Sequence, residues 1–207
     1  MLEMASLGAK VMQPASIQEA RLNRIEIDVR STFSKKIGTT ITRKKNIISK
    51  NTIRGISFTK NDSKITLIGV KDKPGVAASI FKPLYENSVN VDMVVQNISA
   101  NSKETDLTFT IKLEDLSKTR RILENNNSIK FKKLLVNKNV SKVSIVGVGM
   151  ITTPGITYRM FKALAKEKIN IEVISTSEIK ISVLINKKNL KKSVEILHQE
   201  FKLSNNL

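Results

Sequence analysis

The sequence contains no cysteine and a single histidine, His198, among its 207 residues. Without cysteine there can be no disulfide, thiolate nucleophile or cysteine metal site, and such a composition is typical of a cytoplasmic protein. A single histidine argues against a histidine-rich metal site and against a Ser-His-Asp triad. The sequence therefore predicts no metal site and a cytoplasmic location.

Long apolar runs are also missing. No stretch of eighteen apolar residues occurs, so the sequence predicts no membrane-spanning helix. The first residues, MLEMASLGAKV, lack the basic segment and apolar stretch of a secretory signal. We therefore expect no membrane partner.

Acidic and aromatic residues are scarce. The 18 Asp and Glu residues face 36 Lys and Arg, which gives a net charge of +18, and aromatics make up 4%. A strong positive charge can mark a nucleic-acid-binding surface. Only 8 of the basic residues are arginine, however, which is preferred for bidentate phosphate contacts, and aromatics for base stacking are few. Abundant Lys, Asn and Ile fit a general compositional bias, so we expect no nucleic-acid partner.

What the sequence does contain is an internal repeat of about eighty residues. KITLIGV (64–70) aligns with KVSIVGV (142–148). When two extra residues are allowed in the second turn, Pro74-Gly75 aligns with Pro154-Gly155 and Val91-Asp92 aligns with Ile171-Glu172. One structural unit is therefore present twice.

Each copy has the same order of strands and helices. A β-branched run ending in glycine predicts a strand, and after Pro-Gly the apolar residues have helical spacing. Two alternating segments then predict a strand pair, and a second helix follows. The first copy adds a possible last strand at 131–137. The order βαββαβ is the ferredoxin-like pattern, with two helices on one face of a sheet.

The second copy has no segment for a last strand after its second helix. The best spare strand is residues 52–60, just before the first copy. We expect this segment to complete the second sheet, so that the first unit is inserted in the second. The predicted fold is α+β, with a first repeat at 64–137 and a second repeat formed by 52–60 and 142–207.

Residues 1–50 lie outside the repeat. Their pattern predicts two short helices, a strand in IEIDVRSTF and a basic connector at 34–50. So short a segment cannot bury a large core. We expect it to be the end of a larger domain, or an arm that packs on another body.

The Pro-Gly turns are candidate binding sites. A helix start leaves backbone N–H groups without partners, which attract a carboxylate or phosphate, and glycine lets a ligand approach the backbone. Asp72 lies just before the first turn, and Asp92 can accept an ammonium group. A carboxylate receptor and an ammonium receptor together make an amino-acid site. The alternative is that Pro-Gly simply starts a helix, which is common.

Motifs for catalysis are not found in the sequence. There is no phosphate-binding loop and no G-x-G-x-x-G fingerprint, and the scattered carboxylates form no recognisable acid-base pair. We therefore name no catalytic residue. The sequence favours a binding module over a self-contained enzyme.

Several blocks closely resemble, in order, the tandem ACT domains at the carboxyl end of aspartate kinase. The resemblance covers about 64–203, and MLEMASLGAKVMQPASIQEA resembles the last part of that enzyme's catalytic domain, an α/β amino-acid-kinase fold. The blocks are ITLIGVKDKPGVAASIF, VNVDMVVQNIS, DLTFT, KVSIVGVGM, PGIT and INIEVISTSEIKISVLI.

This resemblance implies a function in amino-acid biosynthesis. The complete enzyme phosphorylates aspartate with ATP and Mg²⁺, which opens the synthesis of lysine, threonine and methionine. Its ACT domains bind lysine, threonine or both, and thereby inhibit the kinase. For this chain the resemblance implies no cofactor of its own. The implied partners are a second copy paired through the ACT domains, a catalytic aspartate kinase subunit, or both.

The resemblance also implies the effector-binding residues, in two groups. The first repeat supplies a helix entry and the strand that receives the amino group and side chain, and the second repeat supplies equivalent positions. The residues are Asp72, Pro74, Gly75, Val76, Ala77, Asn90, Val91, Asp92 and Gln96, followed by Ile156, Thr157, Asn170, Ile171, Ser177 and Glu178.

The chain departs from the family in two ways. The second turn, GMITTPG, has no aspartate aligned with Asp72, so we expect the two sites to differ in effector affinity. The family's Lys-Phe-Gly-Gly-Thr-Ser block and nearly all of its catalytic domain are absent. The chain is then a carboxyl-terminal piece of aspartate kinase or a regulatory subunit, and the fifty preceding residues favour a piece. The alternative is a stand-alone amino-acid-binding ACT protein that acts on another partner.

Overall fold

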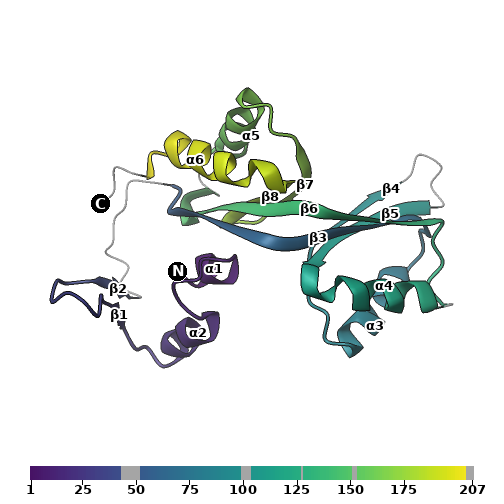
Figure 1. Ribbon diagram of the computed structural model, residues 1–207, viewed down its shortest axis with the longest axis horizontal. Helices are drawn as coiled ribbons and strands as arrows, with labels where there is room; N and C mark the ends of the chain where they lie inside the picture. Colours follow the sequence, from purple (N-terminus) through teal and green to yellow (C-terminus); the bar gives the residue numbers. More distant parts are fainter. Residues whose placement is uncertain (43–51, 99–103, 127, 151–152, 204–207) are drawn as a thin grey trace.

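The computed structural model describes residues 1–42, 52–98, 104–126, 128–150 and 153–203. Its centre is one antiparallel sheet in the strand order β4-β5-β3-β6-β8-β7, on which helices α3 to α6 pack (Figure 1). The strands are β3 (Gly55–Lys71), β4 (Val91–Ile98), β5 (Glu104–Lys112), β6 (Lys133–Val146), β7 (Ile171–Thr176) and β8 (Lys180–Asn186). The helices are α3 (Val76–Glu86), α4 (Leu116–Asn125), α5 (Ile156–Lys166) and α6 (Leu190–Glu200).

Strands β3 and β6 run through both repeats. The sequence analysis divided each into two strands, 52–60 and 64–70 in one case and 131–137 and 142–148 in the other, and this division was wrong. The polar residues at 60–63 look like a turn in the sequence. In the structure they lie at register shifts in the β3–β6 pairing, and the strand continues through them.

The segment before the first repeat belongs to the sheet of the second repeat. Residues 55–59 of β3 pair with residues 142–146 of β6, and β6 pairs on its other side with β8. This is the pairing expected if the first unit is inserted in the second. Each half of the shared sheet then has the ferredoxin-like strand order, and the exact domain limits stay a prediction.

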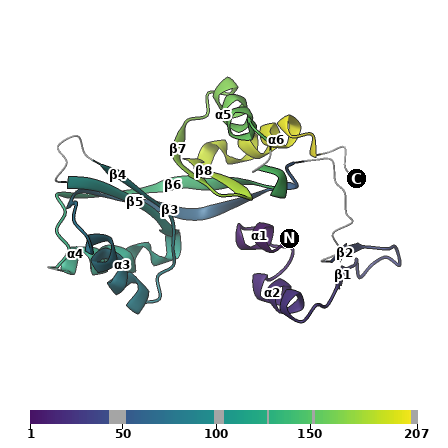
Figure 2. The same cartoon turned by 180° about the vertical axis from the view of Figure 1, so that it is seen from behind.

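The two repeats bury opposite faces of the shared sheet. Ile65 and Leu67 of β3 lie in the core of the first repeat, whereas Ile56 of the same strand packs against the core of the second. Side chains of alternate residues point to opposite faces of a strand. Accordingly, α3 and α4 cover one face and α5 and α6 cover the other (Figure 1 and Figure 2).

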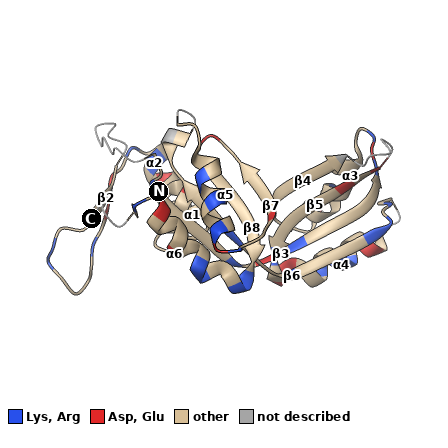
Figure 3. Cartoon of the chain, turned by 90° about the horizontal axis from the view of Figure 1, so that it is seen from above, with Lys and Arg blue, Asp and Glu red and all other residues tan. Residues whose placement is uncertain are grey.

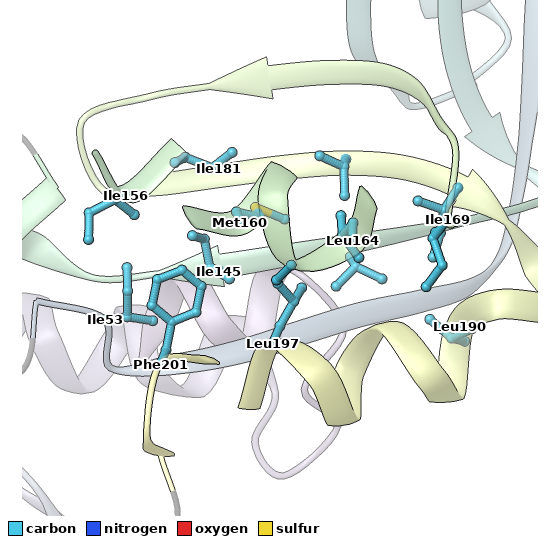
Figure 4. Packing of buried hydrophobic residues seen from close by; sticks show 14 residues of the cluster. Ile53, Ile145, Ile156, Met160, Leu164, Ile169, Ile181, Leu190, Leu197 and Phe201 are labelled. Carbon is cyan, nitrogen blue, oxygen red and sulfur yellow. The ribbon is translucent and has the colours of Figure 1, made fainter. Parts of the chain in front are cut away.

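Each repeat has its own apolar core beneath its pair of helices. In the second repeat, Leu164 of α5 and Leu197 of α6 lie over Ile145 of the sheet (Figure 4). Leu84 of α3 takes the place of Leu164 in the first repeat, and both side chains are fully buried. These helices have 10 or 11 residues. No helix in the described part of the chain is long and apolar enough to cross a membrane.

The N-terminal helix α1 (Leu2–Ser6) packs against β3 where β3 belongs to the second repeat. Ser57 Oγ donates a hydrogen bond of 3.0 Å to the carbonyl oxygen of Met4, and Ala5 and Leu7 are buried. A Cβ atom on Gly55 would lie 2.6 Å from Met4 Cε, so the glycine makes room for this helix. The N-terminal segment is therefore joined to the second repeat by packing.

A small hairpin follows α2 (Pro14–Leu22). Strand β1 (Ile27–Val29) pairs with β2 (Thr39–Ile41). The sequence analysis placed β2 in a connector at 34–50, which was wrong because the Thr and Ile residues there form a strand. The remainder of that connector, 43–50, lies outside the described residues.

Because β3 and β6 serve both cores, we expect the two repeats to unfold together. Leu84→Ala and Leu164→Ala remove equivalent buried side chains, and each should lower the free energy of unfolding by about 2–5 kcal/mol. Both should shift the same single transition in urea, followed by circular dichroism. Tyr85→Ala, which truncates a neighbouring side chain that is 81% exposed, is the matched control and should change little. Two separate transitions in either variant would contradict this expectation.

Candidate ligand-binding site

The two Pro-Gly turns have the same backbone geometry. Gly75 has φ 89° and ψ −11°, and Gly155 has φ 88° and ψ −4°. Both lie in the left-handed region that glycine adopts without strain. A Cβ atom placed on either glycine would meet no described heavy atom within 4 Å. Each turn therefore presents open backbone at the start of a helix.

A groove of about 480 Å³ lies beside the first turn. That volume falls within the range of small-molecule sites. The groove joins the turn to the edge strand β4 and to β5. It brings together six predicted residues, Asp72, Pro74, Gly75, Val76, Ala77 and Gln96, with Val70, Lys71, Lys73, Ile80, Thr105 and Leu107.

Asp72 and Gln96 supply polar groups from two elements of this groove. Gln96 Nε2 lies 3.4 Å from Asp72 Oδ1, at the long end of hydrogen-bond distances. Asp72 comes from the turn after β3, and Gln96 comes from β4. An aspartate carboxylate accepts hydrogen bonds from an ammonium group, and a glutamine amide both donates and accepts. These two side chains can therefore orient a ligand that carries an ammonium group.

A second hollow of about 420 Å³ borders the other side of the same turn. The ammonium groups of Lys71, Lys73 and Lys130 line it together with the hydroxyl-bearing Ser79 and Ser128. Among the described residues that line it there is no carboxylate. The three cations, next to the positive end of α3, favour a negatively charged ligand group on this side.

Three predicted residues at the start of β4 do not line the groove. Asn90 is exposed just before the strand, and Val91 packs against the core of the first repeat. Asp92 Oδ2 accepts a hydrogen bond from Lys142 Nζ of β6, and Asp92 Oδ1 accepts one of 2.8 Å from the backbone N–H of Met93. Lys142 thus occupies the place that the sequence analysis gave to a ligand ammonium. A ligand contact at Asp92 stays a prediction.

The environment of Asp92 favours its charged form. Partial burial raises the pKa of this carboxyl, but the hydrogen bond and charge of Lys142 and the Met93 amide outweigh it, so the pKa is lowered. The Lys142 side chain is only 8% exposed, so the ion pair is partly removed from water.

The predicted residues of the second repeat are dispersed. The Ile156 side chain is buried in the core, and Ile171 packs against that core. Part of the second turn, residues 151–152, lies outside the described residues, so the site is incompletely described. The remaining predicted residues, Thr157, Asn170, Ser177 and Glu178, are exposed.

The sequence analysis missed the lysines that meet these acidic residues. Lys142 pairs with Asp92, and Lys64 Nζ lies 2.5 Å from Glu172 Oε2. A signal was available, because the repeat aligns Lys64 with Lys142 and Asp92 with Glu172. Opposite charges at repeat-related positions can pair across the repeats. In the described part of the chain, no group of three His, Cys, Asp or Glu side chains is arranged to hold a metal ion.

Known sequences resemble this chain over nearly its whole length. Residues 65–126 and 143–201 match a family model described as an ACT domain. A protein of Pseudomonas fluorescens (strain SBW25) named aspartate kinase is 43% identical over 205 residues, which cover 98% of this chain and 49% of that protein. An aspartokinase of Helicobacter pylori (strain 26695) is 41% identical over 211 residues, or 98% of this chain and 51% of that protein. The chain therefore spans about half the length of the curated relatives it matches.

Solved structures give the same result. A chain in the crystal structure of aspartokinase alpha and beta subunits is 41% identical, with a TM-score of 0.68, and the match covers 73% of this chain and 99% of that one. The ligand-free regulatory subunit of aspartate kinase from Thermus thermophilus is 34% identical, with a TM-score of 0.68 and coverage of 72% and 99%. Clostridium acetobutylicum aspartate kinase is 25% identical, with a TM-score of 0.83 and coverage of 96% and 46%.

The Asp92–Lys142 pair predicts a pH-dependent stability. Since the folded protein lowers the pKa of Asp92, the pair stabilises the fold above the unfolded pKa of about 3.9. This contribution is lost as the pH falls through the lower folded pKa. The excess stability of the parent over Asp92→Asn should therefore be full near neutral pH and shrink in acid.

Urea unfolding at a series of pH values measures this difference. Lys142→Met, which removes the other partner, should produce a difference with the same pH dependence. A difference between parent and Asp92→Asn that stays constant between about pH 3 and pH 7 would show that the pair does not stabilise the fold.

Proposed function

Since this chain belongs to the aspartate kinase family and carries its tandem ACT domains, we propose that it binds an end-product amino acid, lysine or threonine, and so inhibits the kinase. The observation that carries the proposal is the groove beside the first turn. There the carboxylate of Asp72 and the amide of Gln96 face the open backbone of Gly75.

The charges around the first turn fit the two ends of an amino acid. The ligand ammonium would be received by Asp72, where a charge-assisted hydrogen bond can form. Its carboxylate would lie toward the start of α3, beside the ammonium groups of Lys71 and Lys73. Thr105 and Leu107 of β5 line the groove and would contact the ligand side chain.

The second turn would bind a ligand less tightly or bind a different one. It has the same glycine geometry at Gly155 but no aspartate aligned with Asp72. Without that carboxylate the ligand ammonium would lack its strongest partner in the turn. We therefore assign the principal effector site to the first repeat.

We further propose that phosphoryl transfer takes place in the rest of the enzyme. In the complete protein, ATP and Mg²⁺ would serve the transfer of phosphate to aspartate, in the cytoplasm. The regulatory chain would act through a partner, which is a second copy joined through ACT domains, a catalytic aspartate kinase subunit, or both. Inhibition then requires that the effector bind the inhibited arrangement more tightly than the active one.

Calorimetric titration of the chain with L-lysine and L-threonine, separately and together, tests the proposed function. Asp72→Asn should weaken the binding of the effector roughly ten- to a hundredfold, because one charge-assisted hydrogen bond contributes on the order of 1.5–3 kcal/mol. Glu114→Gln is the matched control, since it removes an exposed acidic side chain of the same repeat that does not line the groove. If neither amino acid binds the parent, the proposal fails.

The isolated chain should also transfer no phosphate. An assay of ATP consumption with L-aspartate and Mg²⁺ should give no more product than a buffer blank. Turnover that rises in proportion to the concentration of this chain, and that survives repurification, would contradict the assignment to a regulatory role.

A further inference from the structure

The same ion pair is formed twice between the two repeats. Lys142 of the second repeat pairs with Asp92 of the first, and Lys64 of the first pairs with Glu172 of the second. The internal repeat aligns the two lysines with each other and the two acids with each other. Both pairs therefore cross from one repeat to the other, and they are related by the repeat.

The surroundings of the two pairs are also alike. Each acid lies at a register shift of an edge strand, Asp92 in β4 and Glu172 in β7. Side-chain exposure is 8% for Lys142, 23% for Lys64 and 16% for Glu172, so these groups are largely removed from water. Surface pairs contribute little to stability, whereas breaking a desolvated pair leaves a charge without its partner at a high cost.

An apolar cluster lies between the two pairs. It is formed by Met93 of β4, Val140 of β6, Val173 of β7 and Leu184 of β8. Strands β4 and β7 stand at opposite ends of the strand order, yet the curled sheet brings them close to each other (Figure 3). Met93 follows Asp92 and Val173 follows Glu172, so a movement of either acid is passed directly into the shared cluster.

Each ion pair also joins parts of both candidate ligand sites. The first site is built from the turn after β3 and from β4, which carries Gln96. The equivalent parts of the second repeat are the turn after β6 and strand β7. The Lys64–Glu172 pair ties β3 to β7, and the Lys142–Asp92 pair ties β6 to β4. The turn strand of each site is thus bound to the edge strand of the other.

We propose that these two ion pairs and the cluster between them couple the ligand sites of the two repeats. An amino acid held at the first turn and Gln96 fixes β4, and through Asp92 it fixes the strand that leads to the second turn. The same connection runs from β7 through Lys64 to the first turn. By linkage, each site must then change the affinity of the other by the same factor. The ligand part of this inference rests on the proposed function, whereas the coupling of β4 to β7 does not.

Hydrogen exchange of the free chain tests the coupling without a ligand. Lys142→Met breaks only the pair at β4. If the strands are coupled, amides of both β4 (residues 93–97) and β7 (residues 171–176) should exchange at least about fivefold faster, the lower limit of typical coupling. Lys142→Arg keeps the charge and should retain slow exchange in both strands. Amides 107–111 of β5 report global unfolding and set the reference rate for each variant.

A matched control separates coupling from the loss of any lysine. Lys132→Met breaks the more exposed pair with Glu104, which lies within the first repeat, and should leave β7 at the parent rate. Asp92→Asn should reproduce the effect of Lys142→Met on both strands. If β7 keeps the parent rate relative to β5 when either partner of the Asp92–Lys142 pair is removed, the coupling is refuted.

A titration then extends the test to ligands. With L-threonine or L-lysine saturating one site of the parent, the dissociation constant of the other amino acid should change at least about fivefold. In Lys142→Met this ratio should return toward one. If the parent binds both amino acids with a ratio of one, the inference fails although the proposed function stands. If the parent binds neither, the proposed function fails and the exchange rates alone decide the coupling.

Discussion

The pairing of β3 with β6 is the constraint on which the rest of the structure depends. Each of these strands serves both repeats, so neither repeat can form its sheet without the other. The register shifts between Thr59 and Lys64 let the strand pair continue while the buried face changes. A shift of one residue reverses which side chains face a core, so this short stretch decides that the two helix pairs lie on opposite faces.

The sequence predicted the units of this fold well and their connections poorly. Helical spacing after Gly75 and Gly155 predicted α3 and α5, because that periodicity is local. The polar stretch at 60–63 was interpreted as a break between strands, since a bulge that is held by pairing with β6 leaves no periodic trace. Local pattern fixes which segments form strands, whereas the length of a strand depends on a partner far away in the chain.

The candidate site shows the same division. The turn residues Asp72 to Ala77 were predicted together because they are adjacent, and the structure adds Gln96 of β4 to them in one groove. The assignment of Asp92 to the ligand overlooked Lys142, which is fifty residues away in the sequence but on a strand of the same sheet. Lys71 and Lys130 likewise meet only after folding. The chemistry of a residue was readable from the sequence, but the group that it would meet was not.

The duplication has left one function shared by the two repeats and another divided between them. The lysine and acid that join the repeats are present in both copies, and each pair needs one member from each copy. The ligand groove differs, because Asp72 has no aligned aspartate in the second turn. A pairing that uses both copies can tolerate no divergence in either, whereas a groove built within one copy can specialise freely. Two unequal ligand sites held together by equal ion pairs are what this constraint produces, and only unequal sites allow one effector to act through one repeat while the other repeat transmits its effect.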